Sequence, residues 1–177
     1  MSLPVPDTSQ HPVWSVYDEL RTARLNVLCL QNVLSSLRTS DRASEILIAV
    51  TTTTSIGSFW FLQNKAGEYI WKTVGCVAVV VSIVKPILKY GHRIQANEKL
   101  LAGYTLLHHE LNCLCIEIRF LQRFDNAIYK DFLKIMDSKA DLLKASSETN
   151  VSATLRKKCE QQVLQELPTE LFYIPPA

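Results

Sequence analysis

Residues 46–62, ILIAVTTTTSIGSFWFL, and residues 69–88, YIWKTVGCVAVVVSIVKPIL, decide how this chain folds. The first stretch has no charged residue, and as a helix at ~1.5 Å per residue it would span roughly 25 Å. The second is largely apolar at its centre, and Lys72 and Lys85 lie near its ends, where long side chains reach lipid headgroups. The polar turn 63–67, QNKAG, separates them. The pair predicts a helical hairpin that crosses a hydrocarbon core of ~30 Å twice.

Aromatic and β-branched residues indicate whether lipid or protein surrounds this hairpin. Trp60 and Trp71 lie on the turn side of the two stretches, as residues at a membrane interface do. Valine forms soluble helices poorly, but in lipid every backbone group must be bonded within its own segment. Two alternatives stay open. Residues 51–62 and 74–84 could pair as buried strands, because both are rich in β-branched residues, or the hairpin could fill the core of a soluble helical bundle.

Charge placement predicts the orientation of the hairpin. Basic residues flank its outer ends: Arg21, Arg24, Arg38 and Arg42 before it, and Lys85, Lys89 and Arg93 after it. The turn holds only Lys65, balanced by Glu68. Basic residues mark the cytoplasmic ends of membrane spans, so we expect a multi-pass protein with both termini in the cytoplasm. The five scattered cysteines fit free thiols in a reducing compartment, and the polar first forty residues hold no cleavable signal peptide.

Apolar stripes predict amphipathic helices on both sides of the hairpin. Before it, the stripe comprises Val16, Leu20, Ala23, Val27, Leu30, Leu34 and Leu37. After it, a heptad seam comprises Leu100, Tyr104, Leu107, Leu111, Leu114, Ile118 and Leu121. The seam's register continues through Ile128, Phe132, Ile135 and Leu142 and is interrupted at Asp125 and Lys139. We therefore expect one long helix there, which packs on the first stripe and assembles subunits.

The expected fold class is all-α: a membrane protein with a two-helix transmembrane hairpin and a cytoplasmic helical, coiled-coil bundle. Its segments are an irregular N-terminus at 1–11, an amphipathic helix at 12–42, the hairpin at 43–90, a long helix and a C-terminal helix within 91–167, and a tail at 168–177. Asn150 or Ser152 is expected to cap the last helix, and the apolar residues 171–174 to dock on the helices or on another subunit.

The sequence shows no constellation typical of an enzyme or a metal site. The nearest cluster comprises His108, His109, Glu110, Cys113 and Cys115. On a helix His109, Cys113 and Glu117 share one face, but structural zinc sites generally use four ligands. We therefore expect no catalytic residue, metal or cofactor. The net charge of +2 is too small to predict direct binding of nucleic acid.

Hydroxyl side chains along the first span are the candidate functional residues: Thr51, Thr54, Ser55 and Ser58 share one side of the helix. They could bond to their own helix or to a neighbour, or they could line a pore when several subunits assemble. One hairpin is too thin to enclose a channel, so conduction would need a homo-oligomer. Pro86 and Gly91 are expected to form a hinge between the second span and the seam.

The order of these segments resembles the SLATT family, small two-transmembrane effectors found beside nucleotide-signalling or sensor genes in prokaryotic conflict systems. The resemblance covers roughly residues 12–165 and includes the run KPILKYGHRIQANEKLLAGYTLLHHEL at 85–111. It implies a pore-forming or membrane-disrupting effector of the inner membrane, acting in anti-phage defence by abortive infection. The trigger would be a separate sensor protein or a nucleotide second messenger. The alternative function is a non-conducting anchor or scaffold whose cytoplasmic helices dock a partner.

Overall fold

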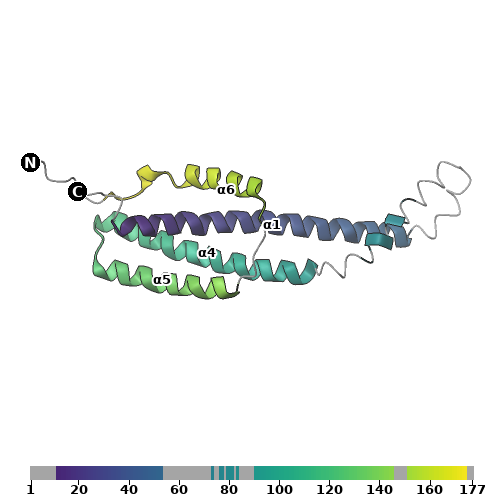
Figure 1. The fold of residues 1–177 in the computed structure, drawn as a ribbon, viewed down its shortest axis with the longest axis horizontal. Coiled ribbons are helices and arrows are strands. Elements are labelled where there is room, and N and C mark those ends of the chain that lie inside the picture. The colour runs from purple at the N-terminus through teal and green to yellow at the C-terminus, as the bar shows by residue number, and fades with distance from the viewer. Residues whose placement is uncertain are drawn as a thin grey trace, which may run out of the picture. The chain divides into compact units, whose positions relative to one another are not determined.

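The computed structural model describes residues 11–53, 73, 76–77, 79–81, 83, 90–145 and 151–174. Over these residues the protein is all-α, as predicted, and contains no strand. Its elements are α1 (Val13–Thr53), α4 (Tyr90–Leu121), α5 (Asn126–Ala145), α6 (Ala153–Glu166) and the short 3-10 helix η2 (Thr169–Leu171) (Figure 1). Residues 51–53 and the described positions between 76 and 83 are helical, which speaks against the strand alternative at those positions.

The chain divides into two compact units. The first comprises Met1–Asn32 and Glu98–Ala177, and the second comprises Val33–Asn97. Helix α1 is continuous through residues 40–44, so the amphipathic stretch and the start of the first predicted span belong to one helix. None of the helices in the described part of the chain is long and apolar enough to cross a membrane. Most of both predicted spans, including residues 54–72 and 84–89, lies outside the described residues.

The core of the first unit joins α1, α4 and α5. It includes Val16, Leu20, Ala23, Val27 and Leu30 of α1, Leu100, Tyr104, Leu107, Leu111, Leu114 and Ile118 of α4, and Ile128 and Phe132 of α5. Both predicted stripes thus face one another within a single chain. Burial of each large aliphatic side chain stabilises the fold by about 1.5–3 kcal/mol, so this shared core fixes the three helices together.

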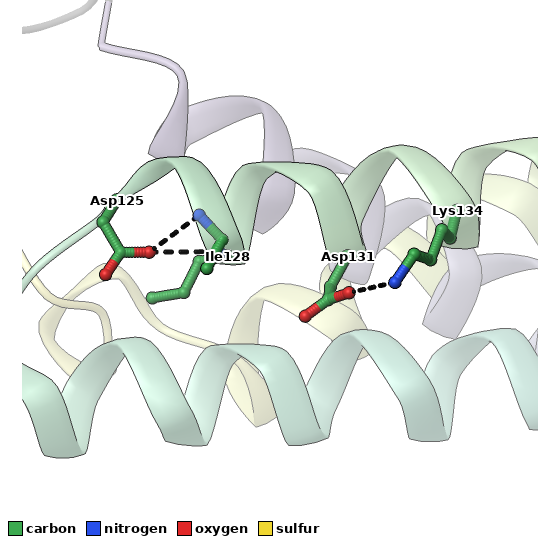
Figure 2. Close-up of polar contacts among 5 residues, drawn as sticks. Asp125, Ile128, Asp131 and Lys134 are labelled. Atoms are coloured by element: carbon green, nitrogen blue, oxygen red, sulfur yellow. Dashed lines mark hydrogen bonds and ion pairs between the residues drawn. The ribbon is translucent and has the colours of Figure 1, made fainter.

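The expectation of one long helix after residue 91 is wrong at Gln122. Helix α4 ends at Leu121, and Gln122 has a φ of 50°, which turns the chain. Asp125 then caps α5: its Oδ1 accepts hydrogen bonds from the backbone N–H groups of Ala127, at 3.0 Å, and Ile128, at 3.1 Å (Figure 2). Aspartate is a preferred N-cap, so the break in the heptad at this position marks the start of a new helix. Helix α5 therefore folds back along α4 instead of extending it.

Helix α6 packs on α1 through a smaller second core. Its N-cap is Ser152, one of the two expected candidates, and the Ser152 side chain accepts a hydrogen bond from the backbone N–H of Leu155. The second core consists of Leu28 and Cys29 from α1 and Cys159 and Val163 from α6. The helix ends at Glu166, ahead of Pro168, and η2 leads into the C-terminal residues.

Candidate functional site

The predicted pore-lining residues fall at the boundary of the described chain. Thr51 lies in the last turn of α1, whereas Thr54, Ser55 and Ser58 lie outside the described residues. The predicted hinge residue Pro86 also lies outside them. Gly91 is the second residue of α4, and the helix continues past it to Leu121.

The heptad seam of α4 is used inside the chain. Leu100, Tyr104, Leu107, Leu111, Leu114 and Ile118 are buried in the core with α1 and α5, and Leu121 is 36% exposed at the end of the helix. The return of α5 is what completes this burial, because it supplies Ile128 and Phe132. The seam therefore packs helices of one chain together and offers no continuous apolar face to a second copy.

The His–Cys cluster of α4 is spread over different faces. His109 and Cys113 are both exposed, and His109 Nε2 lies 3.8 Å from Cys113 Sγ. Cys115 is buried, and His108 is half-buried. Across the described residues, no group of three or more His, Cys, Asp or Glu side chains is placed to hold a metal ion.

Residues 167–174, which we call the C-terminal arm, are held against α1 by a ring stack and hydrogen bonds. The rings of Tyr17 and Phe172 stack with centroids 4.2 Å apart and an interplanar angle of 9°. The Tyr17 hydroxyl donates a hydrogen bond to the backbone carbonyl of Tyr173 at 3.1 Å. Burial raises the pKa of Tyr17 to about 12, so this hydroxyl keeps its proton and remains a donor. The arm is thereby fixed to the first turns of α1.

Arg21 joins the arm to the end of α6. Its guanidinium donates to the Leu167 carbonyl from Nε, at 3.2 Å, and from Nη2, at 2.9 Å. The same Nη2 donates to the Thr169 hydroxyl at 3.2 Å, and the guanidinium carbon lies 4.9 Å from the centre of the Phe172 ring. A cation at this place stabilises the negative end of the helix dipole and the face of the aromatic ring. The Arg21 side chain thus supplies donors to a backbone carbonyl at the end of α6 and positions the arm.

An ion pair lies beside this junction. Arg24 Nε and Glu166 Oε2 are 2.7 Å apart, and Gln162 Nε2 donates to Glu166 Oε1 at 2.8 Å. The hydrogen bond from Arg24, followed by that from Gln162, lowers the pKa of the Glu166 carboxyl. Burial, followed by the positive charge of Arg24, lowers the pKa of His108, which favours the neutral imidazole.

Cys29 and Cys115 are held as thiols. Burial, and next a hydrogen bond with Cys159, raises the pKa of Cys29 to about 12. Burial also raises the pKa of Cys115 to about 12. The thiolate is the reactive form of cysteine, so neither Cys29 nor Cys115 is suited to act as a nucleophile at neutral pH.

A pocket lies between α1 and α6. It is lined by Arg21, Thr22, Leu25, Glu160, Val163 and Leu164 and has a volume of about 250 Å³. Sites for small molecules usually enclose about 300–1,000 Å³. The pocket is below that range, so it gives no support to a small-molecule site.

Comparisons with protein-family models, with curated proteins and with solved structures found no match to this chain.

Proposed function

We propose that this chain is an inner-membrane protein, with the hairpin of residues 43–90 in the bilayer and both termini in the cytoplasm. The observation that supports it is the exposure of helical residues in the second apolar stretch: Val77 is 46%, Val79 59%, Val80 58% and Ile83 59% exposed. Large exposed apolar patches on proteins mark sites where a membrane or another protein binds. Lipid tails solvate such side chains at no cost, and a helix bonds its own backbone groups there.

The proposed activity is triggered permeabilisation of the inner membrane in prokaryotic anti-phage defence, as the resemblance to the SLATT family implies. The support within this chain is the hydroxyl face of the first span, formed by Thr51, Thr54, Ser55 and Ser58. A hydroxyl face can meet water only if several hairpins assemble around it. The trigger would be a sensor protein or a nucleotide second messenger that acts on the helical bundle.

Membrane potential and dye leakage after induced expression test this activity. High-level expression drives assembly by mass action even without the trigger, so we expect leakage from the wild-type chain. Thr51→Leu/Ser55→Leu should abolish it, because the two substitutions remove two of the four hydroxyls from the face. The matched control is Thr52→Leu/Thr53→Leu, which changes residues elsewhere around the same helix and should leave leakage intact. An intact potential under conditions in which the chain forms oligomers would refute the proposal, as would equal leakage in both double variants.

A non-conducting anchor or scaffold is the second candidate, and the C-terminal arm favours it. Leu171 is 41% and Ile174 60% exposed, whereas Phe172 between them is buried. The arm is thus fixed by one aromatic ring and presents two apolar side chains outward. Leu171→Ser/Ile174→Ser should abolish partner capture while leaving the fold intact, and under this function neither form would cause leakage.

A further inference from the structure

Helix α4 carries a second apolar stripe on the side away from its buried seam. We call it the outer stripe, and its members are Ala102, Leu106, His109, Cys113, Ile116 and Phe120. Their spacings are four, three, four, three and four, which is a heptad pattern of its own. Every member is exposed, and Phe120, at 86%, is the most exposed large apolar side chain of the described chain. No member carries a fixed charge.

The outer stripe follows from the geometry of α4. At 3.6 residues per turn, positions two apart differ by about 200° around a helix, so Leu114 and Ile116 point to nearly opposite sides. Leu114 is buried in the core, and Ile116 is 55% exposed. An ordinary surface helix is polar opposite its buried face. This helix instead has a heptad on each side, and among the residues that the structure describes only the buried seam is packed by other helices.

The residues beside the outer stripe favour one orientation of a partner helix. Glu110 and Glu117 lie along one edge, and Thr105, Asn112 and Arg119 lie along the other. In a parallel pair of identical helices, unlike edges face each other, so Asn112 of one copy meets Glu117 of the other. In an antiparallel pair like edges meet, and the glutamates of the two copies would repel each other. The stripe is therefore complementary to itself in the parallel arrangement.

We infer that the outer stripe is the surface through which two copies of this chain pair, α4 against α4, parallel and in register. Equivalent residues form the layers of this interface: Leu106 packs on Leu106, and Phe120 on Phe120, of the second copy. The inference deepens the proposed function and rests on it for its biological role, because it supplies the assembly step that the buried seam cannot. The pairing itself does not require a conducting pore.

One consequence of the register is chemical. Cys113 occupies a layer of the outer stripe and is exposed, so the two Cys113 thiols of a dimer would face each other across the interface. A disulfide requires Cα atoms about 4.4–6.8 Å apart, a separation that a layer of a parallel two-helix pair provides. With diamide as the oxidant, the two thiols give up two electrons and two protons to the diazene bond, and one S–S bond forms.

The test is cross-linking of the full-length chain in detergent micelles and in vesicles. Cys76 is the other exposed cysteine, so Cys76→Ala serves as the background, in which Cys29, Cys115 and Cys159 are buried. Brief treatment with diamide should convert most of the protein to a dimer that a reductant dissociates, and Cys113→Ser should abolish it. The matched control is Cys113→Ser/Asp137→Cys, which places a thiol at an exposed position of α5 away from the outer stripe. It should give no cross-linked dimer.

Light scattering of Phe120→Glu and Ile116→Glu provides the second measurement. Both should convert a dimer into a monomer with unchanged helical content, whereas Leu164→Glu, at a 57% exposed position on α6, should leave the dimer intact. A monomeric wild type without Cys113 cross-links overturns the inference, as does a dimer that persists in Phe120→Glu. If Phe120→Glu instead weakens vesicle binding of a monomer, the stripe lies on lipid and the inference is wrong. A Cys113-linked dimer that causes no leakage refutes the proposed activity alone.

Discussion

Tyr17 and Phe172 stack almost face to face, at 9° and with ring centroids 4.2 Å apart, although they lie near opposite ends of the chain. The Tyr17 hydroxyl also donates a hydrogen bond to the backbone carbonyl of Tyr173, and the Arg21 guanidinium lies over the Phe172 ring. These contacts fix Phe172 and Tyr173 to the start of α1. The C-terminal arm is consequently part of the fold, and its removal should lower the stability of the whole first unit.

Phe172→Ala should therefore destabilise the first unit strongly. Phe172 is 8% exposed, and replacement of a buried phenylalanine by alanine typically costs about 3–5 kcal/mol. Thermal unfolding followed by circular dichroism in detergent would report the loss. Ile174→Ala is the matched control, because Ile174 is 60% exposed on the same arm and should change the midpoint little. Equal effects of the two substitutions would mean that the stack does not hold the arm.

Acidification should destabilise the unit in two steps. His108 has a folded-state pKa below its ordinary value of 6.5, so the unfolded chain binds the proton more readily. Its contribution to stability is complete above pH 6.5 and is lost as the pH falls through the folded pKa. Glu166, lowered from 4.5, acts in the same direction at lower pH because its ionised form is held by Arg24.

Unfolding midpoints between pH 8 and pH 4 check this prediction. His108→Gln should flatten the decline that begins below pH 6.5, and Glu166→Gln should flatten the decline at the acidic end. The control is His92→Gln, which removes an exposed histidine from the second unit. A midpoint that is independent of pH in the wild type would show that neither group is coupled to folding.

Much of the helical bundle is predictable from the sequence, because apolar periodicity alone reveals which face of a helix is buried. Val16, Leu20 and Leu111 are each at most 1% exposed, as their stripes predict. The return of α5 is missed because Ile128 and Phe132 fit the same register whether the helix continues or reverses. Only the positive φ of Gln122 and the cap at Asp125 distinguish the two cases, and Asp125 is the one visible signal.

The C-terminal arm and the outer stripe show two further limits of sequence reasoning. The aromatic content of residues 171–174 predicts docking, but the partners Tyr17 and Arg21 are recognisable only once distant segments meet in space. The outer stripe is present in the sequence as a second heptad on α4. From the sequence alone this second heptad could equally belong to the buried face of α4. The structure separates the two, because α1 and α5 pack on the seam and leave the outer stripe exposed.

Asp125→Ala should shift the start of α5 and reduce stability. The carboxylate accepts two backbone N–H groups that have no other partner within the helix, and loss of an N-cap typically costs about 1 kcal/mol. Asp125→Asn retains an accepting oxygen and should recover most of the loss. Chemical denaturation of the three proteins would measure the differences, and an Asn variant as unstable as the Ala variant would argue against capping as the cause.

Gly103→Ala should destabilise the contact between α4 and α5, although alanine is the better helix former. A Cβ at position 103 would overlap the Cδ2 atom of Leu142, and it would also lie 3.2 Å from Cδ1 and 3.3 Å from Cγ. The overlap therefore involves the whole end of the leucine side chain, which must move out of a partly buried site. Removing the obstacle in Gly103→Ala/Leu142→Ala should leave the helix-propensity gain of about 1 kcal/mol and make the double variant more stable than Leu142→Ala alone. Unfolding midpoints of this four-member cycle measure the coupling, and strictly additive effects would mean that α5 does not approach α4 at Gly103.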